Sequence, residues 1–152
     1  MIVNFQLPTL DKMQAFAKAI APALVAPCVV YLQGDLGVGK TTLVRYVLNA
    51  LAHAQHVKSP TYTIVVPYLI NMLKVFHFDL YRLTDPEELE YLGVQDYFEP
   101  DSICFIEWPD KGKGWLPSAD ITIELNHAHD CRLTVDEEKQ PQLAAVLKDF
   151  KR

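Results

Sequence analysis

The segment that most constrains the fold is a glycine-rich octapeptide in the first third of the chain. It reads GDLGVGKT over residues 34–41 and fits the pattern G-x-x-x-x-G-K-[ST]. Glycines let the backbone curl until several N–H groups point inward, which is what a phosphate chain requires. Such a phosphate-binding loop (P-loop) lies between a strand and a helix. The apolar run Cys28–Leu32 predicts the strand, and the one-face spacing of apolar residues after Lys40 predicts the helix.

Two side chains of this octapeptide suit a nucleotide. Lys40 can reach the β- and γ-phosphates, and the Thr41 hydroxyl can bind Mg²⁺. The free N–H groups and the positive dipole end of the following helix would face the same phosphates. A glycine-rich turn that matches the pattern by chance is the alternative, and the matching strand and helix argue against it.

The length and composition fit one domain spanning residues 1–152. Half of the residues are hydrophobic and 22% are charged, as in an ordinary globular protein with one sizeable core. The formal net charge is -5 and no basic stretch is present, which argues against unaided binding to RNA or DNA. Action beside a partner that holds RNA stays open.

Cysteine usage and hydropathy indicate the compartment. Cys28, Cys104 and Cys131 lie far apart, and an odd number without close pairs argues against a disulfide framework, so we expect buried free thiols. No apolar run approaches about 18 residues, so no transmembrane span is expected. The N-terminus lacks the basic region of a signal peptide. A cytoplasmic location without membrane contact is therefore expected.

Strands that alternate with helices around the P-loop predict an α/β fold, a three-layer P-loop NTPase-like sandwich with a mostly parallel central sheet. Two strands at 63–69 and 73–79 predict one antiparallel hairpin, and Pro67 puts its first arm on an edge. The other expected strands lie at 2–6, 102–106, 121–125 and 131–135. The other expected helices are a Thr9-capped helix at 10–20 with Leu10, Met13, Phe16, Ala17 and Ile20 on its inner side, a short helix that starts at 85–88 and ends at Gly93, and a C-terminal helix near 143–150.

Acidic residues end two of these strands. Glu107 follows the buried run 102–106, the position from which a second acid holds Mg²⁺ in nucleotide hydrolases, with an ordinary strand-end acid as the alternative. Asp79 would orient water or polarise a hydroxyl, and an ion pair with Arg82 or a helix cap is an equal alternative. His77 shares a strand face with Asp79 and is interpreted as a core histidine.

Two loops complete the candidate sites. Residues 59–63, SPTYT, follow the P-loop helix where a switch loop would place hydroxyls near Mg²⁺ or the γ-phosphate, and a plain turn is the alternative. Residues 127–130, HAHD, have no obvious remote ligands and are interpreted as a solvated hairpin loop. No Asn-Lys-x-Asp element for guanine is present, so ATP is the expected nucleotide.

Several separated segments together resemble the TsaE (YjeE) family. They are GDLGVGKTT at 34–42, SPTYT at 59–63, HFDLYRL at 77–83, the acidic PEELE at 86–90 and IEWP at 106–109. The resemblance runs in order and spacing from about Val29 to Pro117, and Val38 stands where a smaller alanine is common.

The resemblance implies a small bacterial ATPase required for the threonylcarbamoyl modification of adenosine 37 in tRNAs that read codons starting with A. Such a protein works with the TsaB–TsaD pair, in which TsaD transfers the threonylcarbamoyl group, and it meets tRNA only through that complex. Its ATP hydrolysis resets the complex between turnovers. The implied cofactors are ATP and Mg²⁺.

Matched position by position, the resemblance also implies roles for residues. The residues implied to bind the nucleotide are Asp35, Leu36, Gly37, Val38, Gly39, Lys40, Thr41 and Thr42. Those implied to hold Mg²⁺ are Thr41 and Glu107, and those implied to support hydrolysis or switching are Lys40, Asp79, Glu107 and Thr61. Trp108 matches the family's tryptophan beside the metal acid, and Thr9 and Arg132 are candidates for contacts with adenine.

Two other functions stay open from the sequence. A small-molecule kinase would need a substrate pocket and a basic lid, and neither is apparent. A nucleotide-gated binding module would use the same strand-end acids to bind Mg²⁺ and nucleotide without turnover.

Overall fold

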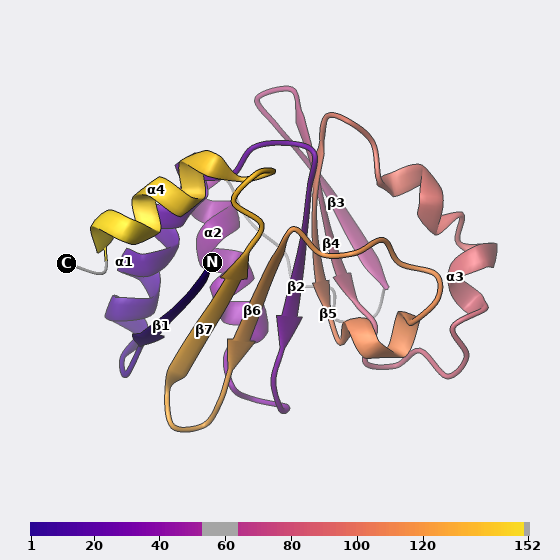
Figure 1. Ribbon diagram of the computed structural model, residues 1–152. Helices are drawn as coiled ribbons and strands as arrows, with labels where there is room; N and C mark the ends of the chain where they lie inside the picture. The colour runs from indigo at the N-terminus through magenta and orange to yellow at the C-terminus, as the bar shows by residue number, and fades with distance from the viewer. Residues whose placement is uncertain (53–63, 151–152) are drawn as a thin grey trace.

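The computed structural model describes residues 1–52 and 64–150 as an α/β fold built on one sheet (Figure 1). The strands are β1 (Ile2–Gln6), β2 (Cys28–Gln33), β3 (Val65–Ile70), β4 (Leu73–Asp79), β5 (Ser102–Glu107), β6 (Ile121–Leu125) and β7 (Asp130–Val135). The α-helices are α1 (Leu10–Ile20), α2 (Lys40–Ala52), α3 (Glu88–Tyr91) and α4 (Pro141–Phe150), and short 3-10 helices occupy Ala21–Ala23, Val94–Tyr97 and Pro109–Gly112.

The strand order in the sheet is β1-β7-β6-β2-β5-β4-β3. Strand β2, which leads into the P-loop, is therefore central, with β6 and β5 parallel to it on its two sides. Strand β4 extends this parallel block beyond β5. Four parallel strands thus end at one edge of the sheet, where ligands of open α/β sheets bind.

The expectation of a mostly parallel sheet is only partly correct, because three of the six strand pairings are antiparallel. Strand β3 pairs antiparallel with β4, as expected for the hairpin, and it is the edge strand that carries Pro67. At the other side β7 runs antiparallel to both β6 and β1. Short connections account for the β3–β4 and β6–β7 pairings, since a few residues join only antiparallel neighbours, whereas β1 and β7 lie at opposite ends of the chain. In the β3–β4 turn, Asn71 and Met72 both have positive φ, at 51° and 70°.

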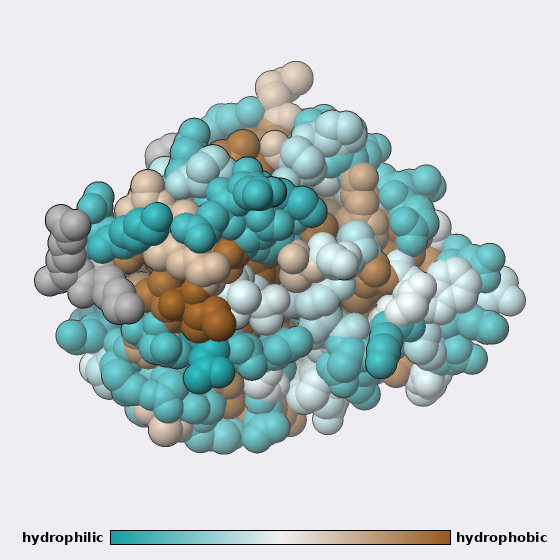
Figure 2. Space-filling view, in the orientation of Figure 1, coloured by the Kyte–Doolittle hydropathy of each residue, from teal (hydrophilic) through white to brown (hydrophobic). Residues whose placement is uncertain are grey.

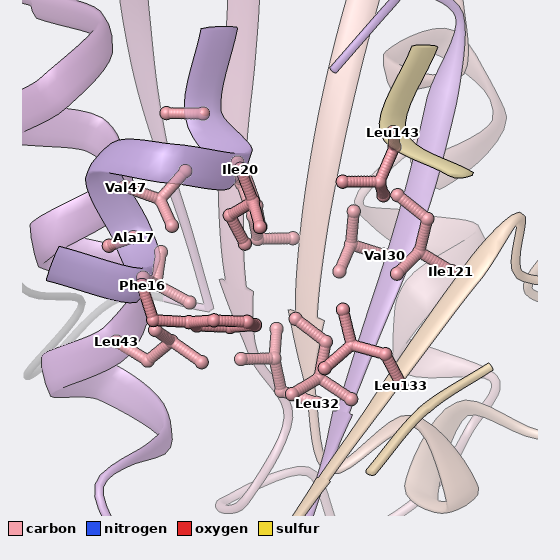
Figure 3. Close-up of a cluster of buried hydrophobic side chains, with 14 of the residues drawn as sticks. Phe16, Ala17, Ile20, Val30, Leu32, Leu43, Val47, Ile121, Leu133 and Leu143 are labelled. Atoms are coloured by element: carbon pink, nitrogen blue, oxygen red, sulfur yellow. The ribbon is translucent and has the colours of Figure 1, made fainter. Parts of the chain in front are cut away.

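Helices α1, α2 and α4 cover one face of the sheet and enclose the larger hydrophobic cluster (Figures 1 and 3). In Figure 3 the labelled side chains come from α1, α2 and α4 and from strands β2, β6 and β7. Several of them, including Phe16 and Leu43, are fully buried, and each such side chain contributes about 2 kcal/mol by leaving water. The opposite face carries α3 and a smaller cluster around Phe78 and Leu89. The three-layer arrangement is present, with short helices as its third layer.

The first helix begins and ends where the sequence predicts. The Thr9 side chain accepts a hydrogen bond from the Lys12 backbone N–H at 3.2 Å and caps α1. Met13, Phe16, Ala17 and Ile20 are buried as expected, and these four make the inner side of the helix. The pattern predicts Leu10 on the same side, whereas in the structure it is 62% exposed. It is the first helical residue, so its Cα–Cβ bond tilts past the start of the helix instead of onto the core.

The mostly polar surface and the buried free cysteines are the features that the composition and cysteine spacing predict. The face in Figure 2 is mostly hydrophilic, with small apolar areas. All three cysteines are free and buried, as expected, and burial raises the pKa of the Cys131 thiol to about 12. None of the helices within residues 1–52 and 64–150 has the length and apolar character needed to cross a membrane.

Candidate nucleotide site

The P-loop joins the central strand β2 to α2 and has the backbone that its glycines permit. Gly34, Gly37 and Gly39 all have positive φ, at 144°, 81° and 107°. At Gly34 a Cβ atom would lie 2.4 Å from the backbone oxygen of Leu125, at the end of β6. The loop therefore passes so close to the neighbouring strand that only glycine fits at this position.

Lys40, the first residue of α2, is 5% exposed and lies folded into the loop. Its Nζ donates a hydrogen bond to the Gly34 carbonyl oxygen and lies 3.6 Å from the centroid of the Trp108 ring. Desolvation lowers the pKa of the ammonium, while the nearby carboxylates of Glu107 and Asp79 oppose this effect. The positive charge of Lys40 is thus held between the P-loop backbone at Gly34 and the Trp108 ring.

Thr41 and Glu107 are in contact at the N-terminus of α2. The Thr41 hydroxyl donates to Glu107, with Oγ1 at 2.8 Å from Oε1 and 2.9 Å from Oε2. Glu107 is the last residue of β5 and aligns with Leu32 of the parallel strand β2. Because the two strands end side by side, the carboxylate lies next to the first turn of the P-loop helix.

Asp79 ends β4 directly beside Glu107, its register partner on β5. Its Oδ1 accepts a hydrogen bond from the Tyr81 backbone N–H at 3.1 Å. Partial burial raises the pKa of the Asp79 carboxyl, and the charge of Glu107 adds to this increase, while the Tyr81 N–H lowers the pKa. Two carboxylates therefore stand together at the carboxyl ends of neighbouring parallel strands.

These side chains line one cavity of about 220 Å³. Its walls come from the P-loop and first turn of α2 (Leu36, Gly37, Gly39, Lys40, Thr41 and Thr42) and from the strand ends (Asp79, Tyr81, Glu107 and Trp108). Among the described residues, the fold thus brings most of the expected site into one space. Thr61 and the rest of the 59–63 loop lie outside the described residues.

The oxygen donors in this cavity suit Mg²⁺. A hydroxyl and a carboxylate, already in contact beside an ammonium group, are hard ligands of the kind that Mg²⁺ takes together with phosphate oxygens. Thr41 and Glu107 are therefore the residues that could hold the ion. Within the part of the chain that the structure describes, no three His, Cys, Asp or Glu side chains are arranged to hold a metal ion by themselves, so phosphates and water would complete the coordination.

Two features of the site go beyond what the residues alone predict. His77, interpreted from its pattern as a core histidine, is buried but lies with Nε2 2.6 Å from Glu107 Oε2. Trp108, recognised only through a family resemblance, has a left-handed backbone with φ 58° and packs on Tyr81 with ring centroids 5.1 Å apart. In the sequence, the signal that could have found both residues is their position beside a strand-end acid: His77 lies two residues before Asp79, and Trp108 directly follows Glu107.

A second cavity of about 580 Å³ lies on the other side of the P-loop. It shares Gly34 with the loop and is lined by Asn4, Phe5, Gln6, Gln33, Glu124, Leu125, Asn126, Asp130 and Arg132. Residues 126–129 join β6 to β7 as a hairpin loop, so His127, Ala128 and His129 lie in the loop as expected, while Asp130 is the first residue of β7. Arg132 faces this cavity, where its Nε donates to Asn4 Oδ1 at 3.1 Å, whereas Thr9 caps α1.

Comparisons with known proteins agree on one family. The family model described as "Threonylcarbamoyl adenosine biosynthesis protein TsaE" matches residues 7–135. The tRNA threonylcarbamoyladenosine biosynthesis protein TsaE of Haemophilus influenzae is 50% identical over 131 residues, which is 83% of this chain and 83% of that protein. The protein of the same name from Bacillus subtilis is 35% identical over 120 residues, 79% of this chain and 75% of its own length. The crystal structure of Bacillus subtilis YdiB superposes with a TM-score of 0.80 at 25% identity, covering 100% of this chain and 97% of that one.

Proposed function

The chain belongs to the TsaE family, and on that premise we propose that it serves tRNA threonylcarbamoyladenosine biosynthesis as a Mg²⁺-dependent ATPase. The observation that carries the enzymatic part is the contact of the Thr41 hydroxyl with the Glu107 carboxylate, at 2.8 Å. It joins the P-loop to a strand-end acid, which is the arrangement that nucleotide hydrolases use for the metal.

The phosphates of ATP would bind to the backbone N–H groups of residues 35–42 and to the N-terminus of α2. Lys40 would exchange the Gly34 carbonyl and the Trp108 face for the β- and γ-phosphates. Bound Mg²⁺ would neutralise charge on the phosphate oxygens. Thr41 and Glu107, already in contact, would hold that ion with little rearrangement of the strands.

Asp79 is the group proposed to orient the attacking water. One of its oxygens is held by the Tyr81 N–H, and the side chain lines the same cavity as Lys40 and Glu107. Its raised pKa makes it a stronger base than an exposed aspartate. Thr61 is proposed to assist hydrolysis and switching on the sequence match alone.

The nucleoside would lie in the 580 Å³ cavity. Glu107 and Asp79 lie on the β5 and β4 side of β2, so the proposed metal ion and the γ-phosphate end of ATP would lie there. The opposite end must then pass Gly34 toward β6, β7 and β1, where this cavity opens. Its amide and guanidinium groups offer donors and acceptors for a base and ribose, and Arg132 is the candidate we favour for a direct contact.

The partners proposed are TsaB and TsaD, with tRNA reached through their complex. A net charge of -5 supports protein docking in place of direct tRNA binding. ATP hydrolysis would then reset the state of the partner complex, so turnover should be slow alone and faster with the partners.

An ATPase assay with and without TsaB–TsaD tests the proposal, with threonylcarbamoyl adenosine in tRNA measured in parallel. Stimulated phosphate release together with modified tRNA is the expected result. Equal rates with and without the partners would count against the partnership. Tight Mg²⁺–ATP binding with no ADP formed over hours would show a binding module instead, and labelled phosphate on a small acceptor would show a kinase.

A further inference from the structure

His77 lies on β4, on the sheet face that α1 and α2 cover. Its side chain is 2% exposed, and that of Glu107 is 3% exposed. Strand pairing places His77 opposite Phe105, two residues before Glu107 on β5. The imidazole therefore reaches diagonally along the sheet to the carboxylate, where Nε2 lies 2.6 Å from Oε2.

His77 holds this carboxylate from outside the phosphate cavity. An ionised carboxylate has only acceptors, so Nε2 is the nitrogen that carries the hydrogen and donates it. The residues that line the 220 Å³ cavity include Glu107 and Thr41 but not His77. The imidazole thus orients Glu107 without occupying the space in which phosphate and metal would bind.

The second ring nitrogen of His77 indicates which interaction accounts for a histidine at this position. Nδ1 is buried and has no hydrogen-bond partner within residues 1–52 and 64–150. A buried polar atom without a partner costs free energy that an apolar side chain at this position would avoid. Within those residues, the contact with Glu107 is therefore the hydrogen bond that accounts for an imidazole here.

We infer that His77 is a positioning residue, which fixes the Glu107 carboxylate in the orientation that accepts Mg²⁺. The inference rests on the Mg²⁺–nucleotide function proposed above. Removing a group that orients a metal ligand weakens metal binding by about 10- to 100-fold, because the free carboxylate must first be ordered. Loss of the His77 contact should therefore raise the Mg²⁺ concentration that nucleotide binding requires. It should not change the affinity for nucleotide in the absence of metal.

A matched pair of variants, His77→Gln and His77→Asn, separates this role from burial. The glutamine amide nitrogen reaches about as far as imidazole Nε2, whereas the asparagine amide stops near Nδ1. ADP is titrated by calorimetry in EDTA and at a series of Mg²⁺ concentrations. We expect His77→Asn to raise the Mg²⁺ concentration for half-maximal effect about tenfold. His77→Gln should stay close to the wild type, and affinity in EDTA should be equal in all three proteins.

The control for general damage is Val75→Ala, which opens the same face of β4 two residues away at a fully buried side chain. It should lower thermal stability without changing the Mg²⁺ requirement. A readout that needs no variant is the His77 imidazole ¹⁵N signal of the wild type, which should move more with Mg²⁺–ADP than with ADP in EDTA.

The outcomes separate the two hypotheses. An unchanged Mg²⁺ requirement in His77→Asn, an equal change in Val75→Ala, or a His77 signal indifferent to Mg²⁺ would overturn the role of His77 and leave the proposed function standing. A wild-type protein whose ADP affinity does not respond to Mg²⁺ would overturn both.

Discussion

Thr41 and Glu107 are 66 residues apart in the chain, yet the Thr41 hydroxyl lies 2.8 Å from one oxygen of the Glu107 carboxylate and 2.9 Å from the other. Parallel pairing of β2 with β5 creates this contact, because both strands end at the same edge of the sheet. The candidate metal site therefore depends on strand order as much as on the P-loop motif.

Replacing Glu107 with Gln tests the metal role directly. The amide keeps the shape of the carboxylate and removes its charge, so we expect Mg²⁺-dependent ATP turnover to fall by about 100-fold. ADP affinity in EDTA should change little. Phosphate release and calorimetry measure the two effects. Glu90→Gln on the exposed side of α3 is the control and should leave both unchanged. Full turnover in Glu107→Gln would contradict the assignment.

Lys40→Ala should weaken nucleotide binding even without metal. The phosphates lose a charge-assisted donor, which is worth roughly 2 kcal/mol, or about 30-fold in the dissociation constant. Titration of ATP in EDTA measures this loss. The control is Lys18→Ala, which removes an exposed lysine of α1. Similar affinities for Lys40→Ala and the wild type would exclude a phosphate contact from this ammonium group.

Tryptophan fluorescence should report the movement of Lys40. Its ammonium lies 3.6 Å from the Trp108 ring centroid, and binding of phosphate would draw this charge away from the ring. We expect ATP to change the emission of the wild type and of Trp115→Phe, and to leave Trp108→Phe unchanged, since the chain has two tryptophans. A response that survives in Trp108→Phe and disappears in Trp115→Phe would contradict this prediction.

Local sequence patterns predict most elements because their causes are local. Capping by Thr9, the apolar run of β5 and the glycines of the P-loop each act within a few residues. Leu10 shows the limit of periodicity, because a helix end can carry the right spacing and still point past the core.

Local sequence patterns do not predict which strands lie next to each other in the sheet. The alternation of side chains along β4 predicts that His77 and Asp79 share a face of the strand. It does not predict that β5 is the neighbouring strand or that Glu107 is the partner of His77. The antiparallel pairing of β7 with β6 and β1 has the same cause. Tertiary pairing decides these features, and the hydrophobic period is compatible with several strand orders.

Asp79→Asn should raise thermal stability and lower activity together. Burial raises the folded-state pKa of this carboxyl above its ordinary 3.8, so its ionisation opposes folding. The stability that the group contributes is present below pH 3.8 and declines as pH rises through the raised pKa. Asparagine does not ionise, so the variant should have the higher Tm at neutral pH, and this advantage should shrink toward pH 4. Turnover should fall at least about 100-fold if Asp79 orients water.

The P-loop glycines provide a prediction about stability that is independent of nucleotide chemistry. At Gly34 an added Cβ would lie 2.4 Å from the Leu125 backbone oxygen and 2.8 Å from Val38 Cγ2, whereas at Gly37 it would meet nothing within 4 Å. Both positions have positive φ. Gly37→Ala should therefore cost only backbone strain, about 1 kcal/mol, while Gly34→Ala adds a clash with a strand and should cost about 3 kcal/mol or more. Urea unfolding measures the two free energies, and equal losses would show that the close approach of the loop to β6 does not constrain Gly34.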